Sequence, residues 1–385
     1  MYISHINLIN YRNYVNLDLE LQRGLLVFHG NNAQGKTNLL EAIYLLSIAK
    51  AYRAKSDREV INYDTDAQMS QVLAVTHRDL DLIRILVNIR LGTPNSYESK
   101  SDLKKEIRVN GQACSASELV GLVNAVLFDS EDIELVLGSP TTRRRYIDIL
   151  TSQMDRDYLK TLQKYQRVLY QRNHLLRLLR DGRSKIDEIE FWDQALAEHG
   201  AYIVRKRGLI IDEIRGLAKE VHYNLTGSEE EIEINYTPSI YNQIPFDQEM
   251  SDNIKETFAR VLVETHRKDI AMGLTQYGPH RDDLSLKIEG HNASTYASRG
   301  QARTLALALK LGETLLLKKK LGDPPILLLD DIFSELDRPR RARLLEYVTQ
   351  SQQVFLATSD PGNLDGAFLQ QSTRYIVENG EVNKL

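Results

Sequence analysis

Residues 26 to 37 read LVFHGNNAQGKT, and this stretch decides the fold. The apolar run 25–28 is typical of a buried central strand, while 37–48 has leucines and isoleucines at helical spacing. The residues between them fit G-x-x-x-x-G-K-[ST], with the members Gly30, Asn31, Asn32, Ala33, Gln34, Gly35, Lys36 and Thr37. A strand, this loop and a helix in succession predict a phosphate-binding loop.

Such a loop binds phosphate because small residues let successive backbone N–H groups converge on it, and the helix N-terminus adds a partial positive charge. We expect Lys36 to reach the β and γ phosphates and the Thr37 hydroxyl to ligate Mg²⁺. ATP and Mg²⁺ are therefore the predicted cofactors. A tight turn without a ligand is the alternative, and the strand-then-helix context disfavours it.

Composition and charge narrow the class of protein. A chain of 385 residues predicts two domains, or one domain with a large insertion. No apolar run approaches the roughly 18 residues that span a bilayer, so a membrane protein is excluded. The net charge of -4 means that any contact with nucleic acid must come from local basic clusters. With one cysteine, Cys114, and no signal-peptide pattern, we expect a cytoplasmic protein.

The chain before and after about Pro140 differs in its predicted secondary structure. Alternating or apolar runs predict strands at 2–8, 15–21, 82–90 and 106–109, the last followed by an Asn110-Gly111 hairpin turn. From Pro140 helical spacing dominates, and two long helices joined by the polar segment 181–185 predict a helical hairpin. Each arm would be roughly 30 to 45 Å long. A compact helical bundle fits the same pattern.

A second apolar strand, 326–329, ends in Asp330 and Asp331. Strands of this kind carry carboxylates to the edge of the sheet where nucleotides bind. We expect Asp330 to hold the Mg²⁺ shell and Asp331 to orient or deprotonate the attacking water, which makes Asp331 and Lys36 the predicted catalytic residues. Adjacent aspartates also cap helices, and a helix at 332–336 is the alternative explanation.

The segment before the apolar helix 305–317 decides between classes of ATPase. Ser298 and Gly300 stand where that helix begins, and this resembles the signature motif of ABC-type ATPases. In those proteins a serine, a glycine and the helix dipole grip the γ-phosphate held by another subunit. Residues 334–337 look like their D-loop. The long helical insertion is similar to the SMC-like branch.

The chain resembles the RecF family of bacterial recombination mediators and repair ATPases from end to end. The stretches that carry the resemblance are 10–14, 30–37, 50–53, 138–140, 143–148, 275–283, 298–304 and 327–337. The segment Gly278-Pro279-His280-Arg281-Asp282-Asp283 is the most specific of them, and we interpret it as a conformational element rather than a metal site.

The resemblance implies an α/β fold, an ABC-type P-loop ATPase head with a mixed sheet, flanking helices and an inserted helical lobe II. Lobe I would comprise 1–135 and 300–385. Lobe II would comprise 136–299, with the helical hairpin, and end in the signature motif. The resemblance also implies that Arg12 and Gln301 contact the nucleotide.

The function that the resemblance implies is that of an ATP-gated homodimer in recombinational DNA repair and replication restart, within the DNA damage and SOS responses. It would bind single-stranded DNA and single-strand to double-strand junctions or gaps, and help load the recombinase with the partners RecO and RecR. We expect no membrane partner, and a cytoplasmic, nucleoid-associated location.

Some residues depart from the family pattern. Residues 128–132 read FDSED where F-S-P-E-D is usual, and Arg299 stands where glutamine is common. The switch histidine of ABC-type ATPases has no counterpart after the strand 354–357, where Thr358-Ser359-Asp360 follow. We therefore expect slow ATP hydrolysis. The resemblance to the RecF family implies that DNA stimulates it.

Local basic clusters at 143–145, 318–320 and 338–343 could bind DNA phosphates, although such runs are often solvated helix faces. The sequence is compatible with three alternative functions. They are an SMC-like ATPase with another DNA role, a transporter-type ATPase, which would need a membrane subunit, and a P-loop phosphotransferase, which would not need Ser298 and Gly300.

Overall fold

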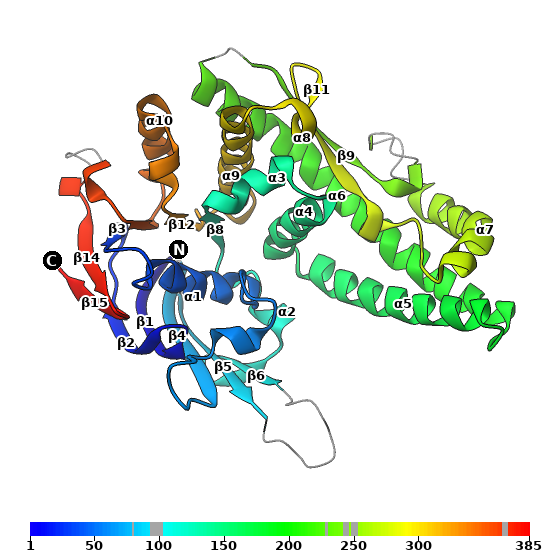
Figure 1. Cartoon of the computed structure of the whole chain (residues 1–385), viewed down its shortest axis with the longest axis horizontal. Helices are drawn as coiled ribbons and strands as arrows, with labels where there is room; N and C mark the ends of the chain where they lie inside the picture. Colours follow the sequence, from blue (N-terminus) through cyan, green and yellow to red (C-terminus); the bar gives the residue numbers. More distant parts are fainter. Residues whose placement is uncertain (79–80, 93–102, 228–229, 242–245, 248–252, 364–368) are drawn as a thin grey trace. The chain divides into compact units, whose positions relative to one another are not determined.

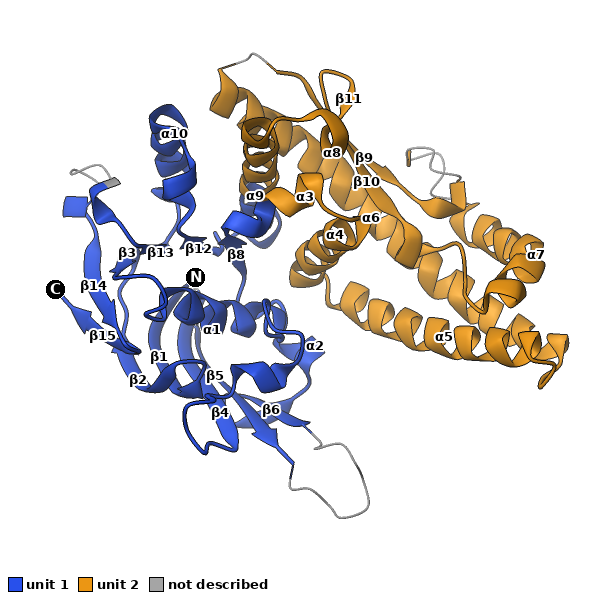
Figure 2. Cartoon of the chain, in the orientation of Figure 1, with its two compact units in different colours: residues 1–132, 313–385 blue, residues 133–312 orange. Residues whose placement is uncertain are grey.

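The computed structural model describes residues 1–78, 81–92, 103–227, 230–241, 246–247, 253–363 and 369–385. They form two compact units (Figure 2). Unit 1 comprises 1–132 and 313–385, and unit 2 comprises 133–312. No helix in the described part of the chain is long and apolar enough to cross a membrane.

Unit 1 contains two six-stranded sheets, visible in Figure 1. The first is antiparallel and has the order β2-β1-β4-β5-β6-β7. Its strands are β1 (Tyr2–Tyr11), β2 (Tyr14–Glu20), β4 (Met69–Arg78), β5 (Asp81–Leu91), β6 (Leu103–Val109) and β7 (Gln112–Cys114). The predicted hairpin turn is present between β6 and β7, where Asn110 and Gly111 both have positive φ, at 50° and 83°.

The second sheet has the order β15-β14-β3-β13-β12-β8 and is parallel except for β15. Its strands are β3 (Gly24–His29), β8 (Ala125–Phe128), β12 (Ile326–Asp330), β13 (Gln353–Thr358), β14 (Thr373–Glu378) and β15 (Glu381–Lys384). Every residue of β12 and β13 is buried, as expected for central strands covered on both faces. The predicted mixed sheet is confirmed.

Helices of unit 1 connect these strands. They are α1 (Lys36–Ile48), α2 (Ala116–Leu119) and α10 (Arg338–Val348), with 3₁₀ turns η1 (Asp57–Val60), η2 (Ser130–Ile133), η7 (Ile332–Glu335) and η8 (Pro361–Asn363). Helix α9 (Arg299–Leu321) begins in unit 2 and ends in unit 1. Because β3 and β12 are separated only by β13, the loop after β3 and the carboxylates after β12 end at one edge of the sheet.

Unit 2 is mainly helical. Its elements are α3 (Glu134–Leu137), α4 (Pro140–Met154), α5 (Arg156–Arg180), η3 (Ile186–Glu188), α6 (Ile189–Thr226), β9 (Ile232–Thr237), η4 (Ser239–Tyr241), α7 (Ile254–Met272), η6 (Pro279–Arg281), β10 (Asp283–Ile288), β11 (His291–Asn292) and α8 (Ala293–Tyr296). The three strands form a small antiparallel sheet of order β11-β10-β9.

The predicted pair of long helices is α5 and α6, which pack together and have 25 and 38 residues. At 1.5 Å per residue they are roughly 38 and 57 Å long, so α6 exceeds the expected length. Helix α7 packs against both, and the pair is therefore part of a three-helix arrangement. Gly200 of α6 makes this possible, because a Cβ there would lie 2.4 Å from a ring carbon of Phe258 on α7.

Candidate nucleotide-binding site

The loop between β3 and α1 has a backbone that only small residues permit. A Cβ on Gly30 would lie 2.2 Å from the Val377 carbonyl oxygen of β14. At Gly35 φ is +118°, and a Cβ would lie 2.7 Å from Nδ2 of Asn13. Ala33 also has a positive φ, 66°. The glycines of the motif are thus required by close approach and by backbone conformation.

Lys36 is the first residue of α1 and is 8% exposed. Its ammonium group donates to the carbonyl oxygens of Gly30 and Asn31, at 2.6 and 2.7 Å. Burial lowers the pKa of Lys36, an effect that the charges of Asp331 and Asp330 oppose. The ammonium is held within the loop by neutral acceptors, so an anionic group entering the loop would be a stronger partner.

The segment after β1 braces the loop from outside. The Tyr14 hydroxyl donates to the Gly35 carbonyl at 2.9 Å, and Asn13 Nδ2 donates to the Gln34 carbonyl at 2.9 Å. Asn38 of α1 in turn donates to Asn13 Oδ1 at 2.8 Å. These bonds explain why Asn13 and Tyr14 belong to a recognisable stretch of the sequence: they fix the conformation of the phosphate loop.

Thr37 and Asp330, the two predicted Mg²⁺ ligands, are hydrogen-bonded to each other. The Thr37 hydroxyl donates to Asp330 Oδ1 at 2.9 Å. The other oxygen of Asp330 lies 3.0 Å from a guanidinium nitrogen of Arg53, which also contacts Asp129 at 3.4 Å. Burial raises the pKa of Asp330, whereas the charge of Arg53 and the Thr37 hydrogen bond act in the opposite direction. No local pattern in the sequence indicates that Arg53 and Asp129 belong to this cluster.

Asp331 has a left-handed backbone with φ of 52°, fixed by its N–H donating to the Ala357 carbonyl at 3.0 Å. It precedes η7, but its side chain makes no capping hydrogen bond. The helix-cap explanation of this aspartate therefore has no support in the geometry. A strained backbone at a carboxylate beside a phosphate loop is the kind of feature found at functional sites.

Arg12 is occupied elsewhere in unit 1. Its guanidinium makes a bidentate pair with Glu41 of α1, at 2.9 and 3.0 Å, and donates to the Glu59 carbonyl at 2.9 Å. Glu41 also accepts from the Arg53 backbone N–H at 3.2 Å. Arg12 thus ties α1 to the segment that carries Arg53, and its contact with a nucleotide stays a prediction.

The residues fit a magnesium nucleotide. Mg²⁺ prefers oxygen ligands and is often held by one or two protein oxygens together with phosphates. Thr37 Oγ1 and Asp330 offer two such oxygens 2.9 Å apart at the mouth of the loop. Lys36 adds a positive charge, and the Arg53 guanidinium lies 3.0 Å from the Asp330 carboxylate.

Sequence comparison places these features in a family. A family model described as RecF/RecN/SMC N terminal domain matches residues 2–383. A DNA replication and repair protein RecF from Chloroflexus aurantiacus is 37% identical over 99% of both chains. Another from Staphylococcus aureus (strain JH9) is 34% identical over the full length of both. The chain belongs to the RecF family.

Solved structures agree with this assignment. A structure described as the recombination mediator protein RecF-ATP in the RecFOR pathway matches with a TM-score of 0.87 and 31% identity. The match covers 100% of this chain and 97% of that one. An SmcHead bound to the C-winged helix domain of ScpA matches with a TM-score of 0.53 and 15% identity, which shows a shared fold. The predicted ATPase-head fold is confirmed.

The signature residues of this RecF family member lie in unit 2, at the start of α9. Ser298 Oγ accepts from the Gln301 N–H at 3.2 Å, and Gln301 Oε1 accepts from the Ser298 N–H at 2.9 Å. This reciprocal capping box fixes the helix start. Gln301 also donates to Glu230 at 2.8 Å, so its side chain is fully engaged. Ser298 and Gly300 are exposed, and the N-terminus of α9 faces solvent within unit 2.

The segment 275–283, most specific to the RecF resemblance, lies inside unit 2. His280 Nδ1 accepts from the Tyr165 hydroxyl at 2.7 Å, while Nε2 donates to the Thr275 carbonyl at 3.1 Å. Burial lowers the pKa of His280 to about 4. Asp282 is fully buried and accepts from the Tyr236 hydroxyl. The sequence left the role of this segment open; the structure shows that it anchors β10 to the surrounding helices.

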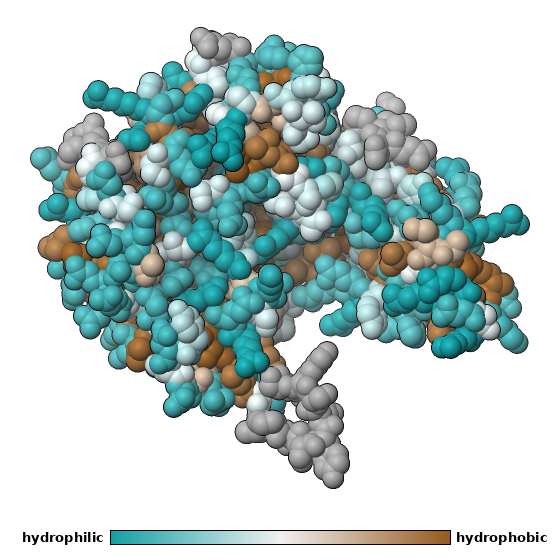
Figure 3. Space-filling view, viewed as in Figure 1, coloured by the Kyte–Doolittle hydropathy of each residue, from teal (hydrophilic) through white to brown (hydrophobic). Residues whose placement is uncertain are grey.

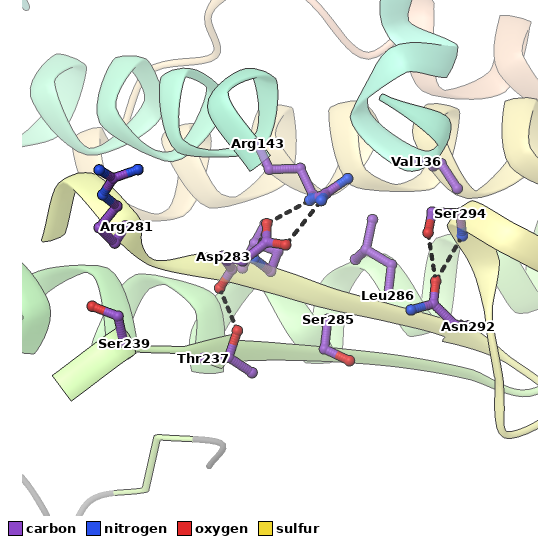
Figure 4. A pocket seen from close by; sticks show the side chains of 11 residues that line it. Val136, Arg143, Thr237, Ser239, Arg281, Asp283, Ser285, Leu286, Asn292 and Ser294 are labelled. Carbon is purple, nitrogen blue, oxygen red and sulfur yellow. Dashed lines mark hydrogen bonds and ion pairs between the residues drawn. The ribbon is translucent and has the colours of Figure 1, made fainter. Parts of the chain in front are cut away.

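Arg143 of α4 pairs with Asp283 at 2.6 and 2.9 Å on the wall of a pocket of about 280 Å³ (Figure 4). Its neighbour Arg144 donates to the Asp282 carbonyl at 2.7 Å. Arg281 points away from this pair in Figure 4. Two arginines of the predicted basic cluster 143–145 are thus committed to contacts inside unit 2.

Proposed function

We propose that this protein is an ATP-dependent DNA-binding protein of recombinational repair and replication restart. It would act as an ATP-gated homodimer at single-strand to double-strand junctions or gaps and assist recombinase loading with RecO and RecR. The names of its relatives support a role in DNA replication and repair. The RecFOR pathway named for a similar structure supports the choice of partners.

The observation that carries the proposal is the contact between the phosphate loop and the carboxylate at the end of β12. The Lys36 ammonium donates hydrogen bonds to carbonyl oxygens of the loop, and Thr37 is hydrogen-bonded to Asp330 at the edge of the sheet. When bound, Mg²⁺ would neutralise phosphate charge and orient the γ-phosphate. Asp331 would hold and deprotonate the attacking water, since no capping bond engages its carboxylate.

The signature residues would complete the site of a second copy. Ser298 and Gly300 stand at the exposed start of a 23-residue helix, whose N–H groups suit an anion. ATP would then be bound between the loop of one chain and the signature of its partner. Turnover would be slow because Thr358, Ser359 and Asp360 stand in the place of a switch histidine, and DNA would stimulate it.

Two inactive variants test the shared site. Lys36→Ala removes the ammonium from the loop and should weaken ATP binding at least tenfold, while Ser298→Arg places a bulky cation at the signature. Neither homodimer has an intact site, but a mixed dimer has one. We expect the mixture to recover ATPase activity and ATP-dependent dimers in analytical ultracentrifugation.

Gel shifts with gapped, single-stranded and duplex DNA, with and without ATP, test the DNA role. ATP-dependent binding with a preference for gapped substrates is the expected result. A wild-type protein that hydrolyses ATP as a monomer and binds no DNA would refute the proposal. Hydrolysis unaffected by DNA at low salt would favour a transporter-type ATPase or a phosphotransferase instead.

A further inference from the structure

Helix α5 has an unusual distribution of charge. From Tyr158 to Arg180 it contains no acidic residue, and Asp157 in its first turn is its only one. The exposed basic residues after Asp157 are Lys160, Lys164, Arg167, His174, Arg177 and Arg180. The whole chain has a net charge of -4, so this helix departs strongly from the average.

The two faces of α5 are chemically distinct. The face toward the other helices carries buried residues such as Tyr158, Leu162 and Tyr165. The opposite face carries Lys160, Gln163, Lys164, Gln166, Arg167, Tyr170 and Gln171, which we call the α5 basic face. Its cations recur about once per helical turn, or roughly every 5.4 Å. In Figure 3 the region where Figure 1 places α5 shows hydrophilic residues interspersed with hydrophobic ones.

The cations of this face are uncommitted. Lys160, Lys164 and Arg167 make no hydrogen bond or ion pair with any residue that the structure describes. The acidic residues at the two ends of α5 are themselves engaged: Asp155 caps α5 and pairs with Lys206 at 2.6 Å, and Asp181 pairs with Arg180 at 3.3 Å.

Arginines elsewhere in unit 2 behave differently. Arg143 is paired with Asp283, and Arg172, on the buried side of α5 itself, is paired with Asp193 and Asp269. Buried cations need such partners because desolvation is costly, whereas exposed ones are free to bind an external anion. Within α5, the buried Arg172 is therefore structural, whereas the exposed cations are available to bind a ligand.

The middle of the α5 basic face is hollowed. Gln163, Gln166, Arg167, Tyr170 and Gln171 line a depression of about 300 Å³. Tyr170 is 66% exposed, so a large ring and three side-chain amides surround a single guanidinium. Amides and guanidinium groups donate to phosphate oxygens, and an exposed aromatic ring packs on sugars or bases.

We infer that the α5 basic face binds the phosphodiester backbone of DNA. The inference rests on the proposed function and names the surface that it requires. A regularly charged anion fits because the cations follow one another along a rigid helix, with no acidic residue between them. A protein partner fits less well, since lysine is depleted in protein interfaces and Tyr170 is the only large exposed hydrophobic residue described on this face.

The test replaces three cations of the face, K160A/K164A/R167A, in the full-length protein. We expect DNA affinity in the presence of ATP to fall at least tenfold at about 0.1 M salt. The slope of log affinity against log salt should fall by roughly 2 to 3, or about 0.9 for each lost contact with duplex DNA. Duplex, gapped and single-stranded DNA are titrated separately, and a loss with any of them supports the inference.

The matched control is K255A/R260A/K268A, which removes the same charges from exposed positions on α7 in the same unit. It should keep wild-type affinity and salt slope, and both triple variants should keep ATP binding and basal ATPase activity. If the α5 variant binds DNA like this control while the wild type binds well, the inference is wrong and the proposed function survives. A wild type that binds no DNA overturns both.

Discussion

The phosphate loop of unit 1 and the segment 275–283 of unit 2 are both rich in polar and charged groups, but they use them in opposite ways. In the loop, the Lys36 ammonium donates to two neutral carbonyl oxygens, and the Asp331 side chain makes no capping hydrogen bond to η7. In the segment, Asp282 accepts from Tyr236 and from the Ser239 N–H, and Arg207 donates to the Pro279 carbonyl at 2.7 Å.

This difference in hydrogen bonding distinguishes a ligand-binding site from a network that stabilises the fold. A site that binds a ligand leaves some polar groups without strong protein partners, so that the ligand can bind them. Such sites also contain strained backbone, as at Asp331 with its positive φ. A supporting network satisfies its groups internally, because an unpaired buried charge would be destabilising. We therefore expect substitutions in the loop to change ATP chemistry and substitutions around 275–283 to change stability.

The largest expected effect is that of Arg207→Ala. Arg207 is 2% exposed and donates to Asp148 at 2.8 Å as well as to Pro279. Arg207 also lies 3.7 Å from the buried Asp282 carboxylate. Its removal leaves these acceptors and this carboxylate without the guanidinium, which typically costs about 3 to 5 kcal/mol. Denaturant unfolding measures the loss, with the exposed neighbour Arg205→Ala as control. Equal stability of the two variants would contradict the description of a closed network.

Asp331→Asn should produce the next largest effect, on turnover. The amide keeps the size of the side chain but cannot accept a proton, so single-turnover hydrolysis should slow about 100-fold or more. ATP affinity and the free energy of unfolding should stay near the wild-type values. A variant that hydrolyses ATP at the wild-type rate would remove Asp331 from the mechanism and leave it a purely conformational role.

The smallest expected effect is a pH dependence from His280. Its pKa is lowered to about 4 in the folded protein by burial, against an ordinary value of 6.5. Between these values the unfolded chain binds the extra proton, so the contribution of neutral His280 is present above about pH 6.5 and is lost as pH falls toward 4. At pH 5 the loss is about 2 kcal/mol.

Unfolding experiments at pH 7 and pH 5 measure this effect, and His280→Gln supplies the comparison because glutamine does not titrate. The variant should lose less stability than the wild type between the two pH values. Identical losses would show that His280 is not held neutral by its surroundings.

Much of the site follows from local sequence. The Gly30 to Thr37 pattern, Asp330 after an apolar strand, and Ser298 before an apolar helix all have short-range signals. The Ser298-x-x-Gln301 spacing is also that of a capping box, and the structure contains one there. Strand β4, with its alternating MSQVLAVTHR, carries a readable signal too, although it was absent from the predicted strands.

Other parts of the site have no local signal. Arg53 comes from an irregular segment between α1 and η1, and nothing nearby in the sequence indicates that it contacts Asp129 and Asp330. Arg12 was assigned to the nucleotide by resemblance, but its observed partner is Glu41, 29 positions away. Arginines 143 and 144 belong to a run of three basic residues that suggests a DNA contact, yet both are engaged within unit 2.

The sequence by itself determined the phosphate loop, the strand and helix that flank it, the carboxylates of β12 and the start of α9. Each of these depends on backbone conformation and residue type over a few neighbouring positions. Only the tertiary structure decided which charges are paired. Arg172 and Arg167 are five positions apart on one helix, and burial beside Asp193 and Asp269 commits the first while solvent leaves the second available, because pairing depends on distances between segments remote in the chain.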